Sequence, residues 1–324
     1  AFGLANLPMV HAGQQGEIVT VSLQPIVSFE RDAPTKTEFG DFTFQNGAIL
    51  RSGHWTFGAF SGLRILKQGR EFWAVTDKGQ WYRGEIERDE EGALLSFANV
   101  QTAPILNQSG TVTQRKFGKD SEALAIAGDK AIVSYERLDV VRGFDIPEVG
   151  LPERGRSVPF PFPKQELRQN EGLEALAIAP LGSQLNGARV ALSEGSINKA
   201  GDLFSFVLDG PQKGTFFVKR RDRYNITDAD FLPGGDMLIL ERRFTLQDGL
   251  NMRIRKIRAT DIKRGQTVDG PTLLDANLDF TIDNMEGLSV WKSSDGDTMV
   301  SLISDDNQNF LQSTVYLEFR YNGD

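Results

Sequence analysis

The sequence predicts an all-β fold and, within that class, a β-propeller. Five short apolar runs rich in β-forming residues each end in a carboxylate. A second apolar strand precedes each run across a Gly, Asp or Asn turn, and these strand pairs recur every 52 to 61 residues. Paired short strands repeated at this period are typical of propellers, in which each repeat forms one blade.

The strand pairs can be followed in order along the chain. Their first strands begin at residues 61, 122, 174, 228 and 286, and their second strands end at residues 77, 136, 194, 241 and 305. The segments after each pair alternate apolar and charged residues, which indicates half-buried outer strands. The five repeats therefore account for residues 61 to about 320.

The N-terminal part supplies further strands. Residues 17–50 hold two β-rich segments that the five repeats do not use, and we expect them to contribute closing strands. We therefore expect a six-bladed propeller that occupies residues 13–324 as a single domain. A five-bladed ring, with the N-terminal strands as an addition, is the alternative.

The first twelve residues are apolar and differ in character from the rest of the chain. Val10-His11-Ala12 fits the small-x-Ala pattern that precedes signal peptidase cleavage. We therefore predict that residues 1–12 are the remnant of an export signal and that the protein is periplasmic or secreted. A simple apolar N-terminal strand or loop is the alternative.

Composition excludes several classes of function. The chain carries 36 basic and 44 acidic residues, a net charge of -8, which disfavours nucleic acid as a partner. No run approaches the ~18 apolar residues of a membrane-spanning helix. With no cysteine and only two histidines, thiol nucleophiles, disulfides and zinc sites with several His ligands are excluded.

Acidic residues mark both ends of each strand pair. In a propeller, the start of the innermost strand and the end of the next strand lie at the same mouth of the central channel, because the two strands are antiparallel. Nine of the ten positions are acidic. The pairs are Ser61/Asp77, Glu122/Glu136, Glu174/Glu194, Asp228/Glu241 and Glu286/Asp305, with Asp306 directly after the last pair.

The negative charge of many carboxylates at one mouth must be compensated, because neighbouring carboxylates raise one another's pKa unless a cation lies between them. Ligands that are all oxygen favour a hard cation, so we predict Ca²⁺, with Mg²⁺ and Mn²⁺ as alternatives. Asn170, Asn284 and Asn307 are candidates to complete its shell. The alternative is that each acid caps a turn or pairs with a neighbouring arginine, as Glu136-Arg137 and Glu241-Arg242 suggest.

A set of short motifs at these positions resembles a known family. The motifs SGL, AVTDKG, SEALAI, SYER, EGLEALA, LILERR, NMEGLSV and LISDDN, in this order and spacing, resemble the phytase-like domain family, named for an esterase-like activity of phytase. The resemblance covers roughly residues 55 to 320. The family is largely bacterial and its members often carry an export signal, so the resemblance implies an exported bacterial protein. It implies that the acidic motif positions are Asp77, Glu122, Glu136, Glu174, Glu194, Asp228, Glu241, Glu286, Asp305 and Asp306.

The resemblance implies a metal-dependent phosphoesterase that acts on a small-molecule phosphate ester or another metal-bridged ligand. Glu174 or Glu241 is then the expected general acid or base. Arg137, Arg242 and Lys199 are candidate phosphate contacts. No G-x-S-x-G motif is present, which argues against a serine esterase. The alternative is a non-catalytic propeller with structural calcium that binds a ligand or protein.

Overall fold

The computed structural model describes residues 12–113, 120–135, 140–160 and 172–323. Glu136, Arg137, Asn170 and residues 1–11 lie outside this part, so the expectations placed on them, export included, stay predictions. Within the described part, no helix is long and apolar enough to cross a membrane. The helices of the described part are two single 3₁₀ turns, η1 (Lys67–Gly69) and η4 (Ala259–Asp261).

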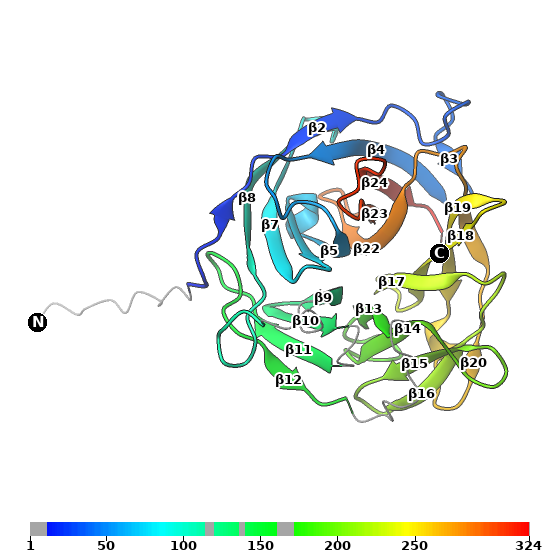
Figure 1. Cartoon of the computed structure of the whole chain (residues 1–324). Coiled ribbons are helices and arrows are strands. Elements are labelled where there is room, and N and C mark those ends of the chain that lie inside the picture. Colours follow the sequence, from blue (N-terminus) through cyan, green and yellow to red (C-terminus); the bar gives the residue numbers. More distant parts are fainter. Residues whose placement is uncertain (1–11, 114–119, 136–139, 161–171, 324) are drawn as a thin grey trace, which may run out of the picture.

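Five sheets stand around a central axis, as Figure 1 shows. Each presents one innermost strand, and each innermost strand contacts the next until the ring closes between the last and the first. A β-propeller is therefore confirmed. The innermost strands are β5 (Phe60–Leu66), β9 (Ser121–Ala127), β13 (Leu173–Ile178), β17 (Asn225–Phe231) and β22 (Asn284–Lys292).

The first three blades continue outward from these strands. Blade 1 adds β6 (Glu71–Thr76), β7 (Gln80–Arg88), β8 (Leu94–Pro104) and β1 (Glu17–Ile18). Blade 2 adds β10 (Lys130–Tyr135), β11 (Val140–Asp145) and β12 (Arg156–Val158). Blade 3 adds β14 (Arg189–Ile197), β15 (Leu203–Val207), β16 (Gly214–Val218) and β20 (Thr267–Val268).

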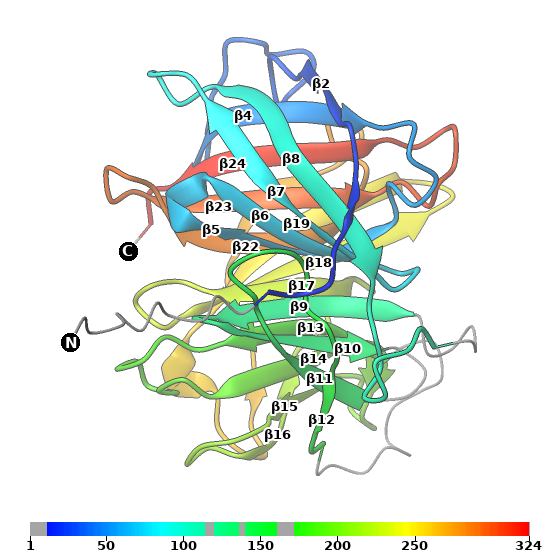
Figure 2. The same ribbon diagram turned by 90° about the vertical axis from the view of Figure 1, so that its left-hand side faces the viewer.

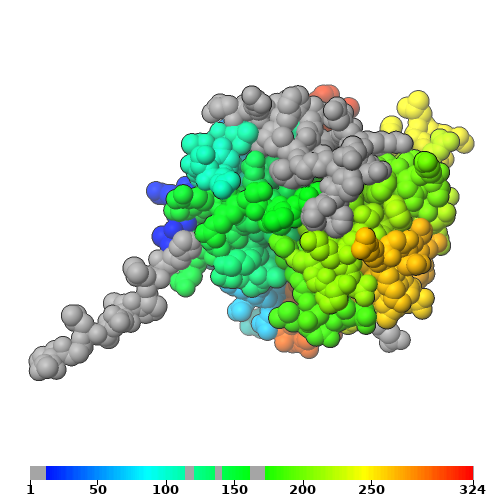
Figure 3. All heavy atoms as spheres, turned by 90° about the horizontal axis from the view of Figure 1, so that it is seen from below, coloured from blue at the N-terminus to red at the C-terminus, as the bar shows by residue number. Residues whose placement is uncertain are grey.

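The last two blades complete the ring. Blade 4 adds β18 (Met237–Thr245), β19 (Gly249–Ile257) and β21 (Thr272–Ala276). Blade 5 adds β23 (Thr298–Asp305), β24 (Thr314–Tyr321), β4 (Phe42–Arg51) and β2 (Ser22–Pro25), with β3 (Glu38–Phe39) beside β4. The segment that carries β20 leaves blade 4 and pairs in parallel with β16, so the orange chain lies beside green blade 3 in Figure 3.

The propeller has five blades and not the expected six, because the N-terminal strands join existing sheets. β4 pairs with the C-terminal strand β24 along its whole length, and the two lie side by side in Figures 1 and 2. β1 pairs with the outer edge of β8. The N-terminal strands thus fill free sheet edges, and hydrogen bonds between the two ends of the chain close the ring.

A buried ion pair reinforces this closure between blades 1 and 5. Arg88 of β7 donates to both carboxylate oxygens of Glu318 in β24, at 2.7 Å and 2.5 Å. Tyr316 and Asn46 also donate to Glu318, whose side chain is fully buried. A buried carboxylate with four donors is well compensated, which is the condition for such a group to be tolerated inside a protein.

Arg64 occupies the middle of the channel. From β5 it donates to Asp228 Oδ2 in β17 at 2.9 Å. The same guanidinium donates to the carbonyl oxygens of Leu176 in β13 and Leu288 in β22. One side chain therefore ties together the innermost strands of blades 1, 3, 4 and 5.

Candidate active site at the channel mouth

An extra residue interrupts the pairing of each innermost strand near the mouth. In β5, β13 and β22 this bulge residue is Ser61, Glu174 and Glu286, respectively. In β9 the bulge spans Glu122 and Ala123. A bulge re-aims the side chain that it carries, so the sequence places polar side chains where the strand pattern is broken.

Blade 4 carries different residues at these positions from those expected. Its bulge residue is Thr227, and Arg242 directly follows Glu241, the partner of the residue before the bulge. The equivalent residues in the other described blades are Asp77, Glu194 and Asp305. The structural counterpart of the predicted pair Asp228/Glu241 is therefore Thr227/Arg242, one residue away in each strand.

Arg242 lies among carboxylates from neighbouring blades. Its Nη2 is 3.2 Å from Glu286 Oε1 in blade 5 and 3.5 Å from Glu194 Oε1 in blade 3. Glu286 is the main cause of the raised pKa of Arg242; Glu194, Glu174 and Asp305 contribute to this rise, and burial opposes it. We call Asp77, Glu174, Glu194, Arg242, Glu286 and Asp305 the mouth cluster.

Two acids of the mouth cluster have strongly shifted pKa values. Burial raises the pKa of Glu286 to about 8, and Asp305 and Glu194 add to the rise, whereas Arg242 and Asn284 oppose it. Burial also raises the pKa of Asp305 to about 7, and the negative charge of Asp77 adds to this rise. One arginine therefore does not compensate all the carboxylates of the cluster.

Asparagine side chains hold two of the glutamates in place. Asn284 Nδ2 donates to Glu286 Oε1 at 2.9 Å, and Asn225 Nδ2 donates to Glu194 Oε1 at 3.1 Å. Asn284 and Asn225 begin equivalent strands, two residues before the bulge residue. Asn284 thus serves the cluster as a hydrogen-bond donor to a carboxylate.

Other predicted residues lie near the mouth in different roles. Asp306 accepts hydrogen bonds from the Ala59 amide, the Gln308 amide and the Thr314 hydroxyl, so it organises loops. A Cβ at Gly58 would collide with its carboxylate. Asn307 and Lys199 lie in the loops after β23 and β14, and Lys199 is exposed. Glu122 sits half-buried in β9.

Asp228 and Glu241 do not join the mouth cluster. Asp228 is fully buried against Arg64 in the channel, and burial raises its pKa to about 7 although Arg64 opposes the rise. Glu241 is fully buried and binds Arg253 at 2.5 Å and Arg255 at 2.6 Å. Because successive side chains of a strand point to opposite faces, Glu241 points away from the neighbouring Arg242.

The fit to a metal ion is mixed. The donor set of the mouth cluster is all oxygen, which suits calcium chemically. Within the described part of the chain, however, no three acidic or histidine residues are grouped so that they could hold an ion. Arg242 instead supplies the positive charge among Glu194 and Glu286. The donor chemistry therefore suits calcium, whereas the acids are not grouped as its ligands, and calcium binding stays a prediction.

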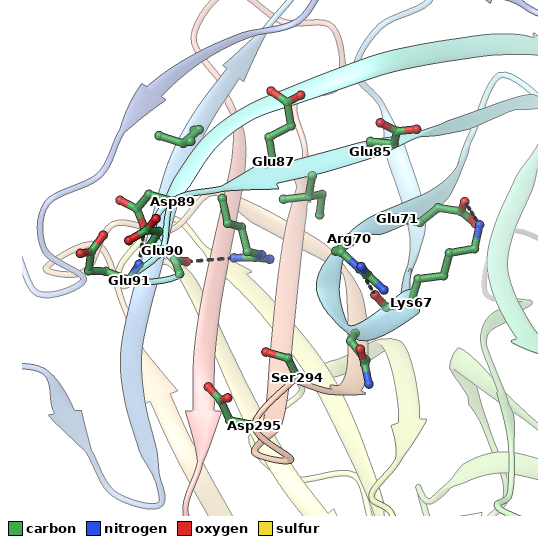
Figure 4. A pocket seen from close by; sticks show the side chains of 15 residues that line it. Lys67, Arg70, Glu71, Glu85, Glu87, Asp89, Glu90, Glu91, Ser294 and Asp295 are labelled. Carbon is green, nitrogen blue, oxygen red and sulfur yellow. Dashed lines mark hydrogen bonds and ion pairs between the residues drawn. The ribbon is translucent and has the colours of Figure 1, made fainter.

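Two cavities differ in their relation to the mouth cluster. A cavity of about 320 Å³ adjoins the cluster through Glu194 and Arg242. A larger one, of about 860 Å³, lies at the opposite end of blade 1, where Figure 4 shows acids of the β7–β8 hairpin on one side and Lys67 and Arg70 on the other. There, Glu71 already accepts hydrogen bonds from Lys67 and Trp73. The converging charges favour the smaller cavity as the functional one.

Sequence reasoning named Arg242 as a candidate phosphate contact but missed its position in the repeat. A signal for the correct register was present. Aligning Asn225-Ile226-Thr227 with Asn284-Met285-Glu286 places Thr227, and not Asp228, opposite Glu286. In the structure, Arg242 pairs with Asn225 as Asp305 pairs with Asn284.

Comparisons with known proteins agree with the sequence motifs. The model of the phytase-like family, described as "Esterase-like activity of phytase", matches residues 55–308. No curated protein matches the chain.

Solved structures of low sequence identity also resemble the chain. A Myxococcus xanthus glutaminyl cyclase is 14% identical, with a TM-score of 0.46, and the match covers 86% of this chain and 95% of that one. A PQQ-bound aldose sugar dehydrogenase from Streptomyces coelicolor is 10% identical, with a TM-score of 0.45 and coverages of 85% and 97%. A luciferin-regenerating enzyme is 11% identical, with a TM-score of 0.41 and coverages of 81% and 92%.

Proposed function

The chain belongs to the phytase-like family, and on that premise we propose that it hydrolyses phosphoric esters at the mouth cluster. The observation that carries the proposal is the convergence of acids from blades 3 and 5 around Arg242 from blade 4, with Asp77 of blade 1 beside Asp305. Arginine binds phosphoryl oxygens through parallel hydrogen bonds. A bound phosphoryl group would take the place of a carboxylate partner on Arg242.

Two carboxylates of the cluster suit general acid–base chemistry. Because the pKa of Glu286 is about 8, this residue is largely protonated at neutral pH and can donate a proton. Asp305, with a pKa of about 7, is partly ionised and can accept one. Paired carboxyl groups with such values are suited to complementary acid and base roles.

The proposed step is a balanced hydrolysis by water. Asp305 accepts a proton from a water molecule as the water oxygen bonds to phosphorus. The phosphorus–oxygen bond of the ester breaks, and Glu286 gives its proton to the leaving oxygen. The products are an alcohol and inorganic phosphate or, from a diester, a phosphate monoester. Arg242 neutralises the charge of the phosphoryl oxygens.

Calcium remains a separate proposal for the same mouth, and the acid–base step does not use it. When bound, a calcium ion would supply further neutralisation of phosphoryl charge. Asp77, Glu174 and Glu194 are the acids of the cluster that the acid–base step does not use. Calcium dependence is therefore one arm of the test.

The test is hydrolysis of p-nitrophenyl phosphate and bis(p-nitrophenyl) phosphate by chelator-stripped protein, with and without added calcium. We expect Glu286→Gln to lower turnover about 10²-fold or more, the usual contribution of a general acid. Glu90→Gln, in the exposed β7–β8 hairpin at the opposite end, is the matched control and should keep full turnover. Equal turnover in both variants would refute the assignment.

A non-catalytic propeller that binds an anionic ligand is the second candidate. The observation that favours it is that Arg242 already bridges Glu194 and Glu286, as arginines do in structural ion-pair networks. Absence of turnover with either ester, together with a rise in melting temperature on adding ligand or calcium, would select this candidate.

A further inference from the structure

A pocket of about 320 Å³ opens beside the mouth cluster, between blades 3 and 4. Blade 3 contributes one residue to its lining, and blade 4 with the turn before it contributes the others. The lining residues are Glu194, Arg223, Asn225, Arg242, Arg243, Phe244 and Thr245. In a chain with a net charge of -8, three arginines against one glutamate make this pocket cationic.

The arginines of the pocket have unused hydrogen-bonding capacity. Within the described part of the chain, Arg242 and Arg243 each bury an Nε–H group that has no acceptor. Among the same residues, Arg223 has no ion-pair partner. Buried donors in folded proteins are nearly always satisfied, so these two Nε–H groups are exceptions among the lining residues.

The local sequence builds the pocket from the segment KRRDRYN, residues 219–225. Asp222 and Arg223 both adopt left-handed backbone conformations, with φ of 53° and 59°, inside a turn closed from the Tyr224 amide to the Arg221 carbonyl. Non-glycine residues rarely adopt this conformation, and it often occurs at functional sites. The turn brings Arg223 to the pocket.

Neighbouring residues restrain the one acid of the pocket. Arg220 Nη2 donates to Asn225 Oδ1 at 2.5 Å, which orients the amide so that Asn225 Nδ2 faces Glu194. Glu194 therefore already has Asn225 and Arg242 as partners. Because Arg242 pairs with Glu194 and Arg243 pairs with Asp248, the cationic surplus of the pocket is the charge of Arg223.

We propose that this pocket binds the phosphoryl group of a small phosphate monoester with an apolar organic part, and that Arg223 is a specificity-determining residue for it. The inference rests on the proposed function and names its substrate class. The dianionic phosphoryl group matches the cationic surplus, and guanidinium groups bind it with good geometry. Phe244, which is 65% exposed, gives the organic part an aromatic wall.

The surroundings of the pocket oppose larger polyanions. Asp248 pairs with Arg243 on one side, and Glu286 pairs with Arg242 on the other. A ligand with several phosphate groups would bring further negative charge against Asp248 and against Glu194 in the lining. The pocket thus selects one phosphoryl group and a compact organic part.

The test is calorimetric titration of the full chain with inorganic phosphate and with phenyl phosphate. We expect Arg223→Gln to weaken binding of both at least tenfold. Arg258→Gln is the matched control, because Arg258 is 70% exposed at the opposite end of blade 4 and its substitution removes the same charge. We expect Phe244→Ser to weaken phenyl phosphate binding and to leave inorganic phosphate binding unchanged.

Binding and turnover are separate readouts, so the pocket and the hydrolase can fail independently. Absence of phosphate binding by the unmodified chain, or equal binding by Arg223→Gln and the unmodified chain, would overturn the inference even if Glu286→Gln abolished turnover. Equal weakening in Arg258→Gln would mean a general charge effect and would also overturn it. Binding through Arg223 without turnover of any ester would support the pocket and reject the hydrolase.

Discussion

At the scale of single residues, Arg242 explains how so many acids share one mouth. It stands at a position that is acidic in the other described blades and contacts carboxylates from the blades on both sides. Burial raises the pKa values of Glu286 and Asp305, and the single charge of Arg242 opposes this rise only in part. Incomplete compensation of this kind is common at active sites, where a group must change its protonation during the reaction.

The two pKa values predict a narrow pH optimum. Turnover should rise as pH increases through about 7, because Asp305 becomes ionised, and fall above about 8, because Glu286 loses its proton. The limbs of the profile belong to the coupled pair rather than to either residue alone. The measurement is kcat/KM for p-nitrophenyl phosphate between pH 5 and pH 10.

Substitution distinguishes the two limbs. Glu286→Gln should remove the fall at high pH, and Asp305→Asn should remove the rise at low pH, each from a much lower maximum. A profile that stays flat from pH 6 to pH 9 in the unmodified protein would contradict the assignment of the acid and the base.

At the scale of elements, the bulges join neighbouring blades. The Ser61 hydroxyl donates to the Ser121 carbonyl at 2.6 Å, and the Thr227 hydroxyl donates to the Met285 carbonyl at 3.0 Å. Each accepting residue stands just before the bulge of the next blade. The two bulge positions that carry hydroxyl groups thus tie one blade to the next.

Thr227→Val should therefore weaken the joint between blades 4 and 5. The change keeps the shape of the buried side chain but removes a hydrogen bond, which costs about 1 kcal/mol of unfolding free energy. Ser61→Ala should cost a similar amount at the joint between blades 1 and 2. Urea denaturation measures both, and unchanged midpoints would contradict the role of the hydroxyl groups.

The bulges also explain what the sequence could predict and what it could not. The repeat period and the polar strand ends of blades 1, 3 and 5 were sufficient to predict the propeller and five acids of the mouth cluster. In blade 4, the acids Asp228 and Glu241 lie one residue away from the equivalent positions, and the sequence prediction chose them for that reason. A shift of one residue turns a side chain to the opposite face, so both acids took up structural partners instead.

At the scale of the whole molecule, the ring is held by its closure and by its centre. The closure needs strands from both ends of the chain, and this explains why the strands of residues 17–50 form no separate blade. Strands so far apart in the sequence show no local pattern that would predict their pairing. At the centre, Arg64 meets residues of four blades, and nothing near it in sequence indicates its partner Asp228.

Removing Arg64 should show how much the unpaired charge of buried Asp228 lowers the unfolding free energy. In Arg64→Met, the carboxylate keeps the amides of Leu288 and Ala229 but loses its cation, so its pKa should rise further above the value of about 7. A raised pKa of an acid favours its neutral form, so the folded variant should be most stable at low pH. It should lose stability as pH rises above the unfolded pKa of about 4 and through the folded pKa.

We expect Arg64→Met to lower the unfolding free energy by about 3–5 kcal/mol at pH 8, the usual cost of leaving a buried charge unpaired. The loss should be smaller at pH 5, where Asp228 of the variant is protonated. Asp230, 3.9 Å from Arg64 Nε, also loses its cation in this variant. Arg64→Met combined with Asp228→Asn should therefore reduce the pH dependence to the part that Asp230 contributes. Equal losses at pH 5 and pH 8 in urea denaturation would show that Arg64 acts through packing alone, because the charges of Asp228 and Asp230 make the cost depend on pH.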